Sequence, residues 1–230
     1  MNFKNLIIVI LTFLTCLITV FSLLDIPEFR IPFEEFKKII EETNSPNAVT
    51  AYYLNYRLYD TMFEVFVFTL SVYGVVFFLN SVPSLEKHTP FSDPVMTFYA
   101  RFAFALSILS AVYIAIVGHL SPGGGFVAGI VAGTGMMLVS LTKTIDEIEK
   151  SFKISKISNY EKITLLVVVL IVIFPVLMGK KSFQNFLPLG ETGKIFSAGF
   201  IPLFDLLIFL KVMFGSWSIT FYFIKHRGVV

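Results

Sequence analysis

Residues 118–129 read GHLSPGGGFVAG and interrupt two apolar segments, each long enough to enter a bilayer. A proline and three successive glycines, at positions 122–125, cannot continue a helix without a cost in free energy. Inside a membrane, backbone that is not helical persists only where protein or water satisfies its polar groups. The stretch therefore predicts a bend between two helices, placed at the membrane.

The composition is that of an integral membrane protein. Of 230 residues, 56% are hydrophobic and 15% are charged, and the mean hydropathy is +0.80. The net charge of +2 gives no reason to expect nucleic acid as a partner. A single cysteine, Cys16, and the absence of any Cys-x-x-Cys motif exclude an internal disulfide and argue against an iron–sulfur or Cys-rich zinc site. We expect no metal, no cofactor and no catalytic residue in this chain.

The fold predicted from hydropathy is an all-α, polytopic transmembrane bundle of about six spans. A span needs about 20 mostly apolar residues, and the candidate segments are 5–24, 59–80, 96–118, 125–142, 161–178 and 197–224. The first apolar run lacks the small residues of a cleavage site, so we interpret it as an uncleaved span rather than a signal peptide. Residues 25–46 alternate apolar and charged positions with a helical period, which predicts a short interfacial helix in the first loop.

Charge in the loops predicts the orientation in a plasma membrane. Residues 143–162 carry five lysines and should be cytoplasmic. Six spans then place both termini in the cytoplasm and the bend on the outer side. The polar segment 81–95 divides the chain into a two-span module, residues 1–90, and a four-span module, residues 91–230.

Ionisable residues within spans are costly, at roughly 2.5–3.5 kcal/mol each, and are therefore candidates for ion translocation. In the second span Arg57, Asp60 and Glu64 have the spacing of one helical face. Arg57 can neutralise one carboxylate, which leaves the other to bind a proton or a cation. The alternative for Arg57 and Asp60 is an ion pair that only anchors the helix at the interface. Glu64 lies one turn deeper and is the stronger candidate.

Two charges stand out in the last span, Asp205 and Lys211. They are separated by about 9 Å along a helix and by about 120° around it, so each needs a partner from another element or chain. A lysine at mid-span can exchange its proton; the alternative is that both residues pair with neighbours for assembly, or that Lys211 extends to an interface. His119 adjoins the bend and is a further candidate.

The fourth span carries a ridge of small residues next to the bend. Gly125, Gly129 and Gly133 recur at a spacing of four, which allows a neighbouring helix to approach closely. Pro122, Gly123 and Gly124 form the bend itself. A phosphate-binding loop is not expected, because the Lys-Ser/Thr ending of that motif is missing.

The pattern Gly118-His119-x-x-Pro122-Gly123-Gly124-Gly125-Phe126-x-x-Gly129 resembles the signature of the B subunit of Mrp-type multisubunit Na⁺/H⁺ antiporters. The likeness extends over residues 97–224, and Phe204-Asp205 matches a Phe-Asp pair of that family. Lys211 lies where the B subunit usually has an apolar residue, so the resemblance assigns it no role.

A second resemblance covers the N-terminal half. Arg57, Asp60, Thr61 and Glu64 match an Arg-x-x-Asp-Thr-x-x-Glu pattern at the carboxyl-terminal end of the antiporter's A subunit. An A-subunit end joined to a B subunit also occurs in archaeal respiratory complexes related to complex I, which couple Mrp-like subunits to a hydrogenase or a sulfane-sulfur reductase. The resemblance implies other Mrp-like subunits (A-, C-, D-, E-, F- and G-like), and an iron–sulfur redox arm carried by other chains, as partners.

Two functions follow. The first is a non-redox subunit that contributes to Na⁺ or H⁺ translocation in such a complex, or in a stand-alone Mrp antiporter. The second is a structural subunit that holds its neighbours together while ions pass elsewhere. An intramembrane enzyme is disfavoured, because no His-Glu-x-x-His or Gly-x-Ser-x-Gly motif is present.

Overall fold

The computed structural model describes residues 33–83, 90, 93–179 and 185–226, which contain helices and no strand. The chain divides into two compact units, residues 1–36 and 37–230, and the account below concerns the second. The predicted span 5–24 lies outside the described residues. The all-helical fold predicted from the sequence is confirmed for the part that is described.

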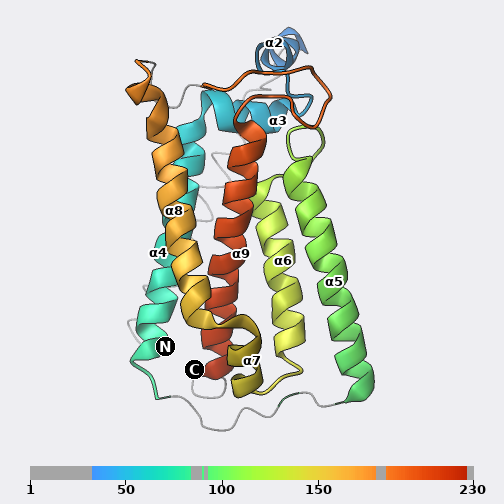
Figure 1. Cartoon of the computed structure of the whole chain (residues 1–230), viewed down its shortest axis with the longest axis vertical. Coiled ribbons are helices and arrows are strands. Elements are labelled where there is room, and N and C mark those ends of the chain that lie inside the picture. Colours follow the sequence, from blue (N-terminus) through green and yellow to red (C-terminus); the bar gives the residue numbers. More distant parts are fainter. Residues whose placement is uncertain (1–32, 84–89, 91–92, 180–184, 227–230) are drawn as a thin grey trace, which may run out of the picture. The chain divides into compact units, whose positions relative to one another are not determined.

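Figure 1 labels most of the described helices and colours them in chain order. They are α2 (Phe33–Thr43), α3 (Ala48–Ala51), the π-helix η1 (Tyr52–Tyr56), α4 (Leu58–Asn80), α5 (Pro94–Ile116), α6 (Gly125–Ser140), α7 (Ile145–Phe152), α8 (Ile154–Leu177) and α9 (Ile201–Lys225). Four of them, α4, α5, α8 and α9, are long and apolar enough to cross a membrane, and α6 is apolar but shorter. α2 occupies part of the segment 25–46, where a short helix was expected.

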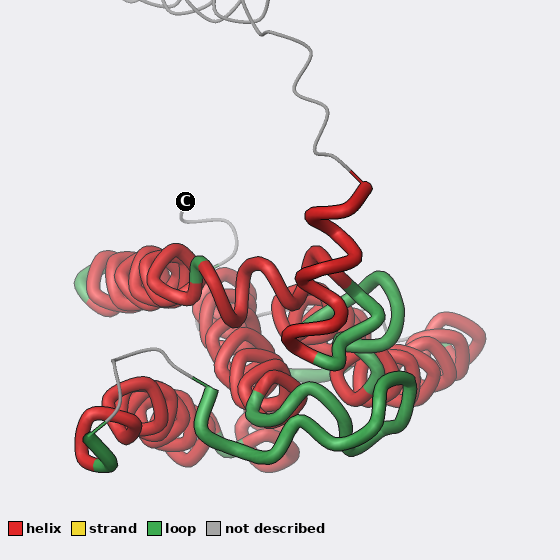
Figure 2. Tube along the Cα trace, turned by 90° about the horizontal axis from the view of Figure 1, so that it is seen from above, coloured by secondary structure: helices red, strands yellow, loops and turns green. Residues whose placement is uncertain are grey.

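Helix α9 is the centre of the bundle. It packs against α4, α5, α6 and α8, and Figures 1 and 2 show the long helices side by side. One apolar cluster joins α4, α8 and α9, and another joins α5, α6 and α9. Outward-facing side chains such as Phe77, 81% exposed, and Leu109, 72% exposed, are apolar as well. Apolar residues on both the inside and the outside are expected when lipid is the solvent, and the chain is a membrane protein.

The helix boundaries have local causes. Asp93 caps α5 by accepting a hydrogen bond from the Val95 amide at 3.2 Å, and Pro94 occupies the first turn, where its missing N–H costs nothing. Thr144 and Glu147 form a capping box at the start of α7. α7 ends at Phe152, and α8 begins two residues later.

Two predicted boundaries were wrong. The segment 143–162, expected to be a loop, contains α7 and the first turns of α8, because helical hydrogen bonding extends beyond the apolar run that hydropathy detects. Arg57 was expected on the helical face of α4. Its backbone is not helical, with φ −121° and ψ 35°, and it precedes the first residue of α4.

Candidate functional site

The bend between α5 and α6 is held by a short segment from the N-terminal half. Three backbone carbonyls of the bend, those of Gly118, His119 and Ser121, accept hydrogen bonds from the segment 45–50. Asn47 Nδ2 donates to Gly118 O and to Ser121 O, both at 2.8 Å, and Ser45 Oγ donates to His119 O at 2.8 Å. Protein groups therefore satisfy the irregular backbone, as a location at the membrane requires. The sequence analysis did not identify Ser45 or Asn47, whose only local signal was a helix N-cap position before α3.

Asp205 of α9 lies inside this bend and caps α6. Its Oδ1 accepts a hydrogen bond from the Gly125 N–H at 3.0 Å, which places a carboxylate at the first amide of the helix. Gly124 has φ 120° and ψ 174°, a conformation open essentially only to glycine. A Cβ atom at Gly118 would lie 2.7 Å from Asp205 Oδ2. The glycines of the bend therefore allow backbone to close around this carboxylate.

Asp205 retains one free oxygen. The side chain is 3% exposed, and its Oδ2 is buried without a hydrogen-bond partner among the described residues. A buried polar atom of this kind is costly unless something pairs with it. The prediction that Asp205 needs a partner from another element is confirmed for Oδ1, which binds an amide of α6, but not for Oδ2.

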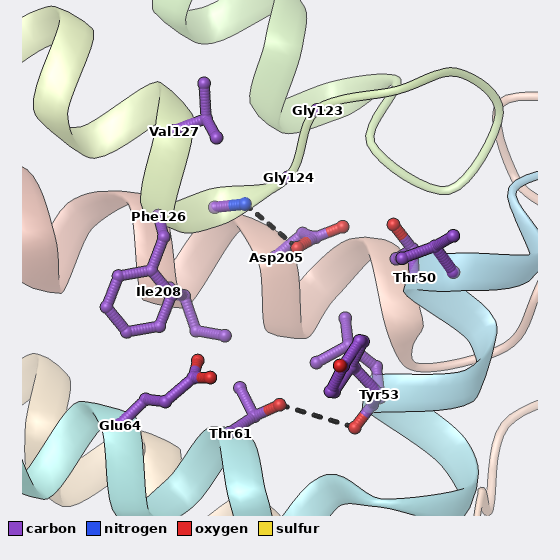
Figure 3. A pocket seen from close by; sticks show the side chains of 13 residues that line it. Thr50, Tyr53, Thr61, Glu64, Gly123, Gly124, Phe126, Val127, Asp205 and Ile208 are labelled. Atoms are coloured by element: carbon purple, nitrogen blue, oxygen red, sulfur yellow. Dashed lines mark hydrogen bonds between the residues drawn. The ribbon is translucent and has the colours of Figure 1, made fainter. Parts of the chain in front are cut away.

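A pocket of about 180 Å³ joins Asp205 to Glu64. Figure 3 shows Glu64 on the α4 side, with its carboxylate directed into the pocket, and Asp205 on the α9 side. Thr61 also lines the pocket, and its hydroxyl donates to Tyr53 O at 3.3 Å. The remaining lining residues come from α3, η1, the bend, the start of α6 and α9: Val49, Thr50, Tyr53, Leu54, Gly123, Gly124, Gly125, Phe126, Val127 and Ile208. Carboxylate and hydroxyl oxygens are the donors that bind hard cations.

The other charged candidates lie outside this pocket. Arg57 forms an ion pair with Asp60, which matches the anchoring alternative for these two residues. His119 is buried beside the bend with Nε2 3.3 Å from Lys194 O, and burial lowers its pKa. Of the sequence candidates, the structure thus brings Glu64 and Asp205 together at one pocket, which Asp60, Arg57 and His119 do not line.

The glycine ridge of α6 is a packing surface. Cβ atoms at Gly129 and Gly133 would lie 2.5 Å from Val212 Cβ and 2.7 Å from Ser216 Cβ, so both glycines abut α9. Gly135 faces α5, where a Cβ would lie 2.7 Å from Ser107 Cβ. Small residues on two faces let α6 fit closely between its neighbours.

Lys211 pairs with a residue that the sequence analysis did not single out. Its ammonium donates to Glu161 Oε1 of α8, and both side chains are buried, at 0% and 2% exposure. Glu161 stood at the edge of a predicted span and was counted as part of the adjoining loop. Two features of the sequence could have identified Glu161: it adjoins an apolar run, and the lysine in the middle of another span needs an acidic partner.

Comparison with known proteins agrees with this architecture. Residues 95–218 match the family described as a domain related to the MnhB subunit of Na⁺/H⁺ antiporter. A chain of the membrane-bound sulfane sulfur reductase, an archaeal respiratory membrane complex, is 28% identical with a TM-score of 0.76, over 98% of this chain and 100% of that one. An uncharacterized protein of Methanocaldococcus jannaschii is 24% identical over 200 residues, 76% of each chain.

A chain of the Mrp complex from Dietzia sp. DQ12-45-1b shares the fold, with a TM-score of 0.74 at 17% identity, and this protein spans 26% of that longer chain. The likeness of the N-terminal module to an antiporter A subunit stays a prediction. The family match covers more than half of the sequence. The chain therefore belongs to the family that shares a domain related to the MnhB subunit of Na⁺/H⁺ antiporters.

Proposed function

We propose that this protein is a non-redox membrane subunit of a multisubunit cation-translocating complex, and that Glu64 and Asp205 bind the translocated Na⁺ or H⁺. The observation that carries the proposal is the shared pocket, which is lined by Glu64 and by Asp205, a buried carboxylate whose Oδ2 has no partner among the described residues. Ionisable groups inside membrane spans are costly and are candidates for an ion pathway by default. The likeness to a chain of a respiratory membrane complex supports an Mrp-like module in such a complex.

In this complex the chain would act with other Mrp-like subunits, and any iron–sulfur redox arm would belong to other chains. A hydrogenase, a sulfane-sulfur reductase and a stand-alone Mrp antiporter are the settings to distinguish. Affinity purification from native membranes separates them: an iron–sulfur chain in the purified complex identifies a respiratory one, and antiporter subunits alone identify the antiporter.

The test of the pocket is Glu64→Gln, with Asp60→Asn as the matched control. Both variants remove one carboxylate from α4, but Asp60 pairs with Arg57 and does not line the pocket. We expect Glu64→Gln to lower Na⁺-dependent dissipation of a pH gradient in everted vesicles by roughly tenfold or more, because an interaction with a charged group contributes about 1.5–3 kcal/mol. Asp60→Asn should retain most of the activity. Equal activity in the wild type and Glu64→Gln would overturn the proposal.

The close packing of α6 between α5 and α9 favours a second function, a structural subunit. A helix with glycines on two faces can organise neighbours without contacting any ion. In that case Glu64→Gln and Asp205→Asn complexes would transport normally per assembled complex, and assembly would fail when the glycine ridge is filled.

A further inference from the structure

A second polar pocket lies at the end of the bundle that carries the Lys-rich segment. It has a volume of about 300 Å³, enough for several water molecules. Its lining comes from α4, α8 and α9: Val72, Tyr73, Val76, Ile154, Ser155, Ser158, Asn159, Glu161, Ser218 and Tyr222. Hydroxyl and amide groups at this density supply the partners that ordered water needs.

Glu161 lies at the inner end of this pocket. Its Oε1 accepts the bond from the Lys211 ammonium, while no described side chain or amide donates to Oε2. The titratable groups that face it are Lys211 and Tyr222 on α9 and Tyr73 on α4. One carboxylate oxygen is therefore held by a cation, and the other is left for solvent in the pocket.

Aromatic side chains separate this pocket from the one beside Asp205. The Lys211 ammonium lies 5.3 Å from the centre of the Phe68 ring, and Phe68 packs edge-on against Phe126, which lines the first pocket. Phe68 is wedged against α9, because a Cβ atom at Gly215 would lie 2.5 Å from its ring. The two pockets thus approach the middle of the bundle from opposite ends, with Phe68 and Phe126 between them.

We propose that Glu161 is a proton-exchange site, reached by water from the Lys-rich end of the bundle. In the exchange, a hydronium ion in the pocket gives its proton to Glu161 Oε2, an O–H bond forms as another breaks, and water remains. A proton suits this site better than Na⁺, because the Lys211 ammonium already occupies the cation position and a proton needs no additional volume. This inference rests on the proposed function in one respect: one of its two tests measures ion transport by the assembled complex.

Water access is tested by cysteine labelling in vesicles with Cys16→Ser as background. Ser218→Cys lines the pocket, whereas Ser216→Cys, on the same helix, faces Gly133 of α6 and does not. We expect a small charged methanethiosulfonate reagent to label Ser218→Cys at least roughly tenfold faster than Ser216→Cys, since only a hydrated thiol ionises readily. Reagent added on one side of the membrane should label Ser218→Cys only if it also labels Asp146→Cys, a substitution at an exposed residue of α7. Equal rates at Ser218→Cys and Ser216→Cys would overturn the proposed access.

Proton exchange is tested by a charge-neutral pair, E161Q/K211M, in the assembled complex. Removing both charges leaves no unpaired buried ion, so a static ion pair would be replaced without loss of transport. If Glu161 exchanges protons, the double variant assembles but its proton flux falls by about tenfold or more. Wild-type flux in this variant would overturn the proposal. This result is independent of the result for Glu64→Gln. If only Glu64→Gln loses transport, the proposal for Glu161 fails. If only E161Q/K211M loses transport, the proposal for the Asp205 pocket fails.

Discussion

At the scale of single residues, the structure shows how three buried charges are accommodated in an apolar bundle. Asp205 uses the first amide of α6, and Lys211 and Glu161 neutralise each other. The sequence of one helix could identify Asp205 and Lys211 as charged residues in an apolar span, but it could not identify the residues that pair with them. Those partners lie 80 and 50 positions away in the sequence.

The ion pair makes a prediction about stability. Lys211→Met alone should lower the free energy of unfolding by about 3–5 kcal/mol, because it leaves the Glu161 carboxylate buried without a cation. E161Q/K211M should recover most of that loss. Thermal unfolding of the purified protein in detergent measures both, and a single variant as stable as the wild type would show that the pair contributes little.

At the scale of elements, the close approach of α6 to α9 depends on glycine. Gly129→Ala would place a methyl group 2.5 Å from Val212 Cβ and should cost about 1–3 kcal/mol through overpacking. Gly74→Ala in α4 is the matched control, because no atom lies within 4 Å of a Cβ there. That substitution should be neutral or stabilise by up to about 1 kcal/mol. Equal stability of the two variants would contradict the packing role.

Helix α7 should depend on pH through its capping box. The Thr144 N–H donates to Glu147 Oε2 at 2.9 Å, and this bond, with that of the Thr144 hydroxyl, lowers the pKa of Glu147 from its ordinary value of 4.5. A depressed pKa means that the stabilisation is fully present above pH 4.5 and is lost as the pH falls through the lowered value. Amide hydrogen exchange across residues 145–152, corrected for intrinsic rates, should therefore show weaker protection at acid pH. Thr144→Ala removes the hydroxyl but keeps the backbone N–H, so it should weaken protection at neutral pH and reduce its pH dependence.

At the scale of the whole molecule, helix α7, which lies within the Lys-rich segment 143–162, and the bend lie at opposite ends of the bundle (Figure 1). The excess of lysine predicts that the α7 end is cytoplasmic. With Cys16 replaced, Asp146→Cys should react with an impermeant maleimide in everted vesicles, and Glu191→Cys, in the connection before α9, should react in right-side-out vesicles. The reverse pattern would contradict the predicted orientation and would place the water access to Glu161 on the outer side.

The sequence by itself determined the membrane class, the all-helical fold, the approximate spans and the bend at 122–125. Each of these follows from local composition and periodicity, because length, apolarity and helix-breaking residues act over a few turns. It also singled out Glu64 and Asp205, because charge inside an apolar run is locally visible.

The tertiary structure decided which of these residues meet. It brought Ser45 and Asn47 onto the bend, placed Asp205 and Glu64 in the lining of one pocket and paired Lys211 with Glu161. None of these arrangements has a local signature, since each joins segments far apart in the chain. They depend on how closely α6 and α9 approach and on which helix faces are buried, which is a property of packing rather than of any single segment.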